Sequence, residues 1–76
     1  MRIEVKLYGD LKRYAPGDGH HFSMRLDPGA TAGRVSEMLD IPNGDHVTLV
    51  NGRRTGRDEA LSDGDILVFM PHVSGG

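Results

Sequence analysis

Residues 1–10 read MRIEVKLYGD, and their pattern decides the first element of the fold. Ile3, Val5 and Leu7 are apolar, whereas the two residues between them carry charges. Successive side chains of a strand point to opposite faces, so this alternation predicts a strand with one face on a hydrophobic core. The charged positions also distinguish the segment from the apolar stretch of a signal peptide.

A second strand and one short helix are expected next. Residues 20–27 repeat the alternation after the turn-forming sequence PGDG, which predicts an antiparallel hairpin with the first strand. Thr31 stands at the N-cap position of a helix that ends before Pro42. The side chains expected to face the core are Phe22, Met24 and Leu26 from the strand and Ala32, Val35, Met38 and Leu39 from the helix.

Three further strands are expected over residues 47–50, 53–55 and 66–70. Asn51-Gly52 suits a tight hairpin between the first two, and Leu61 is expected to anchor an irregular crossover to the last. This order suits an α+β fold in which one mixed sheet curls over one helix. It is the β-grasp arrangement, in which the first and last strands lie parallel at the centre. We expect residues 1–76 to form one such domain, with residues 71–76 as an extended C-terminal tail.

Length and composition limit what the chain can do. With 76 residues, 37% of them apolar and 26% charged, we expect one modest core without room for a separate catalytic cleft. A net charge of -2 argues against general affinity for nucleic acid or an anionic membrane, and no segment approaches the length of a membrane span. The absence of cysteine excludes disulfides, a thiolate nucleophile and a cysteine-ligated metal, so a reducing cytoplasm is the expected location.

The last strand reads ILVFM and is apolar on both of its faces. Leu67 and Phe69 can face the helix. The opposite side of a sheet that has a helix on one face only should be polar, but here it carries a row of large apolar side chains. The residues expected on that side are Tyr8, Ile66, Val68 and Met70. Two interpretations remain open: a central strand with ordinary exposed apolar residues, or a docking patch for a partner protein.

The segment after the last strand contributes little to a core. Pro71 removes a backbone donor and helps to stop the strand. Because glycine has no Cβ, Gly75 and Gly76 could enter a narrow channel and bring a carboxylate to another enzyme's active site. Adenylation would open that carbonyl carbon to sulfur or amine nucleophiles. We therefore expect Gly76 to be the reacting residue. The tail residues expected to contact the partner are Pro71, His72, Val73 and Ser74.

Four segments resemble the MoaD/ThiS family of ubiquitin-like sulfur carriers. They read VKLYGDLKRYA at the start, LDPGATAGRVSEML before and through the helix, VTLVNGR in the third strand, and LSDGDILVFMPHVSGG at the end. The last segment is the most specific of the four. It is more similar to the small subunit of molybdopterin synthase than to the carrier of the thiamin pathway.

The resemblance implies a protein co-substrate, not an enzyme. The Gly76 carboxylate would be adenylated by an ATP-dependent activating enzyme similar to MoeB or ThiF and converted to a thiocarboxylate. The large subunit of molybdopterin synthase, or another sulfur acceptor, would then use it as the sulfur donor. ATP would be bound by the activating enzyme, so no cofactor is expected on this chain.

The remaining candidate sites have weaker support. Adjacent residues on a strand point to opposite faces, so His20 and His21 are unsuited to share a metal, and the other histidines have no partner at ligand spacing. No metal site is expected. Arg53, Arg54 and Arg57 form a basic segment that could meet an acidic surface or simply face solvent. No glycine pattern fits a phosphate-binding loop.

Three functions remain open on the sequence alone. A sulfur carrier would form a thiocarboxylate at Gly76 and serve molybdopterin, thiamin or tRNA thiolation. A ubiquitin-like modifier would join the same activated residue to lysine amines of other proteins. A β-grasp interaction module would not need its terminus, and the fold alone does not choose among the three.

Overall fold

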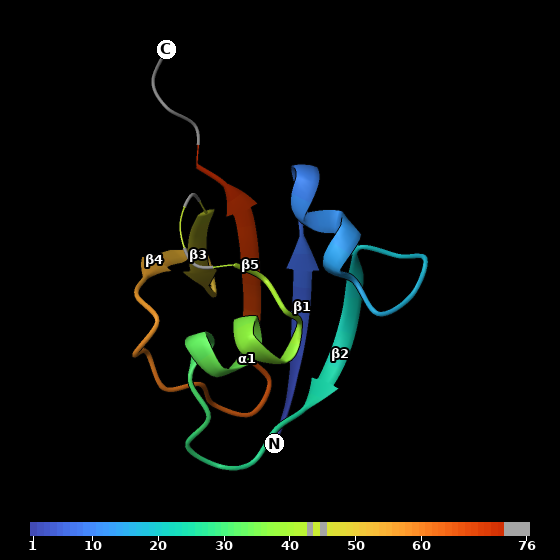
Figure 1. The fold of residues 1–76 in the computed structure, drawn as a ribbon. Helices are drawn as coiled ribbons and strands as arrows, with labels where there is room; N and C mark the ends of the chain where they lie inside the picture. The colour runs from blue at the N-terminus through green and yellow to red at the C-terminus, as the bar shows by residue number, and fades with distance from the viewer. Residues whose placement is uncertain (43, 45, 73–76) are drawn as a thin grey trace.

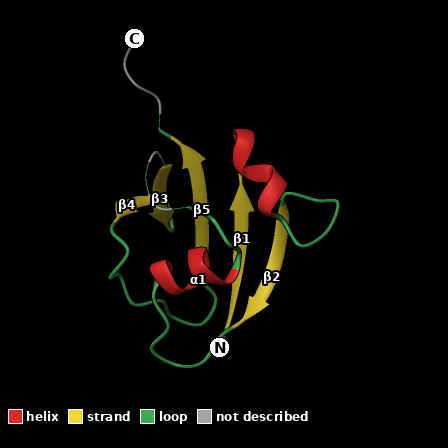
Figure 2. Cartoon of the chain, viewed as in Figure 1, coloured by secondary structure: helices red, strands yellow, loops and turns green. Residues whose placement is uncertain are grey.

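The computed structural model describes residues 1–42, 44 and 46–72 of the chain. Within these residues, a five-stranded mixed sheet has the order β2-β1-β5-β3-β4, and the helix α1 packs across one face of it (Figure 1; Figure 2). β1 and β5 are parallel neighbours at the centre, whereas the other neighbouring strands are antiparallel. The predicted α+β class and β-grasp arrangement are confirmed.

The first part of the chain forms a hairpin and a short 3-10 helix. β1 covers Arg2–Leu7, the 3-10 helix η1 covers Gly9–Tyr14, and β2 covers His21–Arg25. The register pairs Ile3 with Met24 and Val5 with Phe22, so the apolar residues of both strands share the core face. β2 is shorter than the predicted strand over residues 20–27. The residues on either side of β2 still bond to the chain of the first strand: the His20 carbonyl accepts from the Leu7 N–H, and the Leu26 N–H donates to the Met1 carbonyl.

The last part of the chain supplies the other strands. β3 covers His46–Val50, β4 covers Arg53–Thr55, and β5 covers Ile66–Pro71. Asn51 and Gly52 both have positive φ between β3 and β4, as the predicted tight hairpin requires. β5 includes Pro71, so the expected tail begins one residue later, at His72. Proline is tolerated at this position because the end of a strand loses little from a missing N–H.

α1 covers Ala32–Met38 and begins at the predicted N-cap. The Thr31 hydroxyl accepts a hydrogen bond from the Arg34 N–H at 3.2 Å. This bond satisfies one of the free donors that every helix has in its first turn.

The far end of α1 differs from the prediction. Met38 was expected on the core face, but its side chain is 45% exposed. Each residue advances about 100° around a helix, so Met38 lies outside the arc that contains the buried Val35 and Ser36. The buried side chain at this end is that of Ile41. Its N–H donates to the Ser36 carbonyl at 2.9 Å after the chain turns through Asp40, where φ is 61°.

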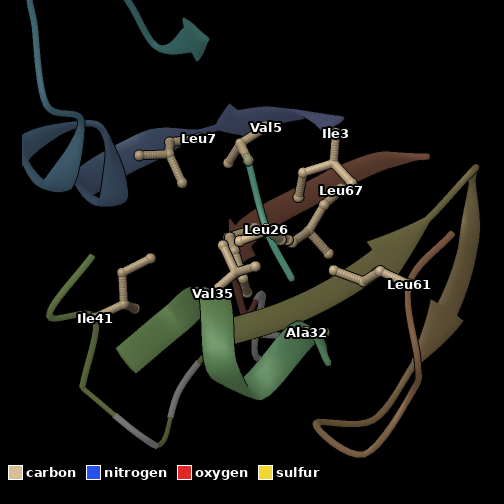
Figure 3. Close-up of a cluster of buried hydrophobic side chains, with 10 residues drawn as sticks. Ile3, Val5, Leu7, Leu26, Ala32, Val35, Ile41, Leu61 and Leu67 are labelled. Carbon is tan, nitrogen blue, oxygen red and sulfur yellow. The ribbon is translucent and has the colours of Figure 1, made fainter. Parts of the chain in front are cut away.

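The hydrophobic core lies between α1 and the sheet face that it covers. Figure 3 shows side chains from β1, β5 and α1 converging there, with residues from the connecting segments closing the ends. The buried apolar residues are Ile3, Val5, Leu7, Leu26, Ala32, Val35, Ile41, Leu61, Leu67 and Phe69. Leu61 is the predicted anchor of the crossover, and its N–H donates to the Ala30 carbonyl at 2.9 Å.

Candidate functional site

β5 divides its side chains between the two faces of the sheet, as its sequence predicts. Leu67 and Phe69 are 0% and 1% exposed on the side of α1. Ile66, Val68 and Met70 alternate with them and project from the opposite face, which α1 does not cover (Figure 1). Ile66 is 40% exposed, and the other two are partly buried.

β3 adds two apolar residues to this face. Val47 pairs with Met70, and Leu49 pairs with Val68, so the four side chains lie on the same side of the sheet. Together with Ile66 they form a continuous strip across the two strands. We call Val47, Leu49, Ile66, Val68 and Met70 the outer apolar row.

Val47 and Leu49 could not be assigned to this face from the sequence, because the polar residue of β3 faces the core and the apolar ones on either side of it face outward. Thr48 is the polar residue of VTLV, yet it pairs with Phe69 and is 8% exposed on the core side. Its two apolar neighbours therefore face outward. The register between β3 and β5 is the signal that identifies them, and a strand read by itself does not contain it.

Charged residues border the outer apolar row on both sides. Glu4 and Lys6 of β1 lie beside the β5 residues of the row, and Arg54 of β4 pairs with Leu49. The Ser23 hydroxyl donates a hydrogen bond to the Glu4 carboxylate, and this bond is the main reason that the pKa of Glu4 lies below its usual value. An apolar strip with a polar rim is the usual layout of a protein interface.

Tyr8 lies just beyond β1 and not within it. It is the N-cap of η1 in an extended conformation, and its N–H donates to the Phe69 carbonyl at 3.0 Å. Tyr8 is 39% exposed, and the centroid of its ring lies 6.0 Å from that of His20, which precedes β2. Because β2 is on the far side of β1 from β5, Tyr8 lies at the margin of the outer apolar row.

The outer apolar row and the start of the expected tail belong to one strand. Pro71 follows Met70, pairs with His46 of β3 and is partly buried, and the next residue, His72, is exposed. The other predicted tail residues lie outside the described residues: Val73, Ser74, Gly75 and Gly76. A protein that covered the row would therefore lie next to the point at which the chain leaves the sheet.

His46 borders the same point on the core side of the sheet. Its ring lies edge-on to that of Phe69, with centroids 5.5 Å apart and planes at 72°. Partial burial, and secondarily the positive charge of Arg57, lower the pKa of His46 below the usual 6.5. Burial therefore favours the neutral form of the His46 ring that packs against Phe69.

The three arginines of the predicted basic segment differ in their contacts. The Arg57 guanidinium lies 3.5 Å from the Glu37 carboxylate, and the Arg57 carbonyl accepts a hydrogen bond from the Gly33 N–H at 2.9 Å. Arg57 thus fastens the crossover to α1. Arg53 and Arg54 are exposed.

The described part of the chain contains no group of three or more histidine, cysteine or carboxylate side chains that could hold a metal ion. His20 lies against Tyr8, and the His21 Nε2 lies 3.5 Å from a carboxylate oxygen of Glu4. Across the same residues, no helix is long and apolar enough to cross a membrane.

Solved structures and one family model resemble the chain, whereas no curated protein sequence matches it. The crystal structure of small archaeal modifier protein 1 from H. volcanii is 28% identical, covers 95% of this chain and 98% of its own, and has a TM-score of 0.78. A Pyrococcus furiosus protein provisionally named molybdopterin converting factor, subunit 1, is 24% identical, with coverage of 95% and 98% and a TM-score of 0.76.

A third similar structure is a chain from the complex of subunits 1 and 2 of the molybdopterin-converting factor of Helicobacter pylori 26695. It is 20% identical over 100% of both chains, with a TM-score of 0.68, and this likeness shows the fold alone. The sequence model of the ThiS family matches residues 5–76, from β1 through the segment that follows β5. The chain therefore belongs to the ThiS family.

Proposed function

We propose that this protein is a sulfur carrier and that the carboxylate of Gly76 carries the sulfur. The observation that carries the proposal is the ThiS family match over residues 5–76, which includes the residues after β5. The fold supports it, because β5 lies at the centre of the sheet and leads into His72. Gly75 and Gly76 have no side chains, which suits a narrow channel.

The proposed chemistry requires a second protein, since this chain is a co-substrate. An ATP-dependent activating enzyme would join a carboxylate oxygen of Gly76 to the α-phosphate of ATP and release pyrophosphate. AMP is a good leaving group, so a sulfur nucleophile can then attack the carbonyl carbon. With hydrosulfide as the nucleophile, the new C–S bond replaces the C–O bond to AMP, AMP departs with the electron pair of that bond, and the terminus becomes a thiocarboxylate. We propose that the reaction takes place in the cytoplasm. The activating enzyme would bind the ATP, and this chain would supply the carboxylate and the surface that the enzyme recognises.

The outer apolar row is the surface that we propose the activating enzyme and the sulfur acceptor recognise in turn. β5 carries three residues of the row and continues into the tail. A protein that binds the row would therefore have the start of the tail at a fixed position beside it. Apolar area removed from water contributes about 25 cal/mol per Å², and the charged rim of Glu4, Lys6 and Arg54 would orient the partner. The complex of subunits 1 and 2 of the H. pylori factor supports a partner subunit of this kind.

Molybdopterin biosynthesis is the pathway that we propose, with the large subunit of molybdopterin synthase as the acceptor. The C-terminal sequence LSDGDILVFMPHVSGG supports it, because it resembles the small subunit of molybdopterin synthase. Two molybdopterin-converting factor chains share the fold. A ubiquitin-like modifier is the second candidate, and the 28% identity to small archaeal modifier protein 1 supports that one. Both functions use an activated Gly76. They differ in the nucleophile, which is sulfur in the first case and a lysine amine in the second.

Release of pyrophosphate from ATP in the presence of an activating enzyme tests the proposal. The full chain should support it, whereas deletion of Gly76 or extension of the chain past it should abolish the reaction and leave the Tm nearly unchanged. Gly75→Val should also block the reaction, because a β-branched side chain restricts the backbone and widens the tail. Retained adenylation of the Gly76 deletion would contradict the proposal.

A further inference from the structure

Gly9 and Pro71 meet where η1 begins beside the end of β5. A Cβ added to Gly9 would lie 2.5 Å from the Cγ of Pro71 and 3.1 Å from its Cδ. Carbon atoms pack at about 3.5 to 4.0 Å, so such a side chain does not fit unless one partner moves. The proline ring closes onto the backbone and cannot rotate away. The movement would therefore displace the backbone at Gly9 or at Pro71.

The backbone at Gly9 is held by its neighbours. The Tyr8 N–H donates to the Phe69 carbonyl at 3.0 Å, and the Tyr8 carbonyl accepts from the Leu11 N–H at 3.1 Å. Gly9 has a φ of 59°, which turns the chain from β1 into η1. It cannot retreat from Pro71 without disturbing this junction.

Pro71 is held on its other side by β3. It pairs with His46, whose ring also packs edge-on against Phe69. Pro71 is the last residue of β5, so its position sets where the chain leaves the sheet. The last strand residue before the expected tail thus lies between two fixed neighbours, Gly9 and His46.

We infer that Gly9 is a positioning residue: it lets Pro71 seat against the junction of β1 and η1, and this contact fixes the direction in which the chain leaves the sheet toward Gly76. The inference rests on the proposed function, because the direction matters only if Gly76 reaches an active site while the outer apolar row is docked. The five residues after Pro71 span at most about 17 Å, so the position of Pro71 limits the region that the Gly76 carboxylate can reach.

A positive φ alone would also favour glycine, and Gly29 separates the two explanations. Gly29 has a φ of 88°, but a Cβ added there would meet nothing within 4 Å. Gly29→Ala therefore strains the backbone without causing a clash, whereas Gly9→Ala strains the backbone and also clashes with Pro71. Pro71→Ala supplies the complementary change, because it removes the Cγ and Cδ that the new Cβ would strike.

The experiment measures kcat and KM for pyrophosphate release by an activating enzyme, with the full chain as substrate, together with the Tm of each variant. Gly9→Ala should lower kcat about tenfold and change KM less than about twofold, because the outer apolar row is intact. Gly29→Ala should lower the Tm and leave both kinetic constants unchanged. In the Pro71→Ala background, Gly9→Ala should cause no further fall in kcat.

Two outcomes would overturn the inference: a wild-type kcat for Gly9→Ala, or a fall that persists in full in the Pro71→Ala background and is therefore due to backbone strain. If Gly9→Ala is too unstable to assay, Gly9→Asn replaces it, since asparagine tolerates positive φ but still carries the Cβ. A wild-type chain that is not adenylated at all would defeat the proposed function itself. A chain that is adenylated equally well with and without the contact would defeat only the role of Gly9.

Discussion

Phe69 and Met70 are adjacent in the chain and lie in opposite environments. Phe69 is 1% exposed on the side of α1, and Met70 belongs to the outer apolar row. Alternation along β5 assigns each side chain to its face. The same substitution at the two positions should therefore affect two different properties, stability at one and binding at the other.

Phe69→Asp should unfold the domain, because it buries a carboxylate without a partner, at a cost above about 4 kcal/mol. Met70→Asp should leave it folded and cost roughly 1 kcal/mol, mainly from the low strand propensity of aspartate. Urea unfolding of both variants measures the difference. A stable Phe69→Asp with an unfolded Met70→Asp would mean that the two faces of β5 are reversed.

His46 should make stability depend on pH below about 6.5. Its pKa is lower in the folded state than the usual 6.5, so the unfolded chain binds more protons as the pH falls. The contribution of His46 to the free energy of unfolding is therefore complete above about pH 6.5, and it decreases as the pH falls toward the lowered pKa of the folded state. Tm measured between about pH 7.5 and about pH 5.5 should decrease, and it should decrease less in His46→Gln.

The pKa of Glu4 is also lowered, but from a usual value of 4.5. Glu4 therefore affects stability only at pH values below the range in which His46 titrates. Identical Tm profiles for the wild type and His46→Gln above about pH 5 would contradict the assignment to His46.

At the scale of elements, β3 and β5 together form the outer apolar row, and its centre is the pair Leu49 and Val68. Leu49→Asp and Val68→Asp should each weaken binding to the activating enzyme and to the sulfur acceptor at least about tenfold, equivalent to about 1.4 kcal/mol. The physical reason is that a charge would be desolvated in the middle of an apolar contact. Dissociation constants from titration calorimetry measure the effect.

Met38 provides a matched control for the outer apolar row. It is an exposed methionine on α1, which packs on the other face of the sheet. Met38→Asp should leave both affinities within about twofold of the wild type, whereas Met70→Asp should weaken them. Equal losses in the two variants would exclude the row as the specific docking surface.

The start of α1 offers a separate test of stability. Thr31→Ala removes the hydroxyl that accepts from the Arg34 N–H and should cost about 1 kcal/mol of unfolding free energy. Thr31→Ser keeps that acceptor and should cost less. Chemical denaturation of the two variants measures the difference, and equal stabilities would show that the capping bond does not stabilise the domain.

The elements could be predicted from sequence because their signals are local. Alternation defines β1, and the N-cap at Thr31 marks the start of α1. The two errors have different causes. Thr48 is buried because its register places it beside Phe69, a contact between distant segments that a local pattern does not contain. Met38 is exposed because it lies outside the buried arc of α1, and the turn at Asp40 brings Ile41 to that end of the core instead.

At the scale of the whole molecule, the side chains that stabilise the fold and those proposed to bind partner proteins lie on opposite faces of the sheet. α1 and the core occupy one face of the sheet, and the outer apolar row occupies the other. Three of its five members could be predicted from β5 alone, because a strand with two apolar faces exposes one of them. Val47 and Leu49 required the register of β3. The contact of Gly9 with Pro71 required three-dimensional coordinates, since the two residues lie near opposite ends of the chain.

The intact mass of the protein, purified from cells that produce it together with its activating enzyme, tests whether Gly76 carries sulfur. We expect a population in which one terminal oxygen of Gly76 is replaced by sulfur, and the loss of that population when Gly76 is deleted. Attachment of the chain to lysines of larger proteins, without any such population, would identify a modifier in place of a carrier. A terminus that stays an unmodified carboxylate in the presence of the activating enzyme would contradict the role of Gly76 as a sulfur carrier.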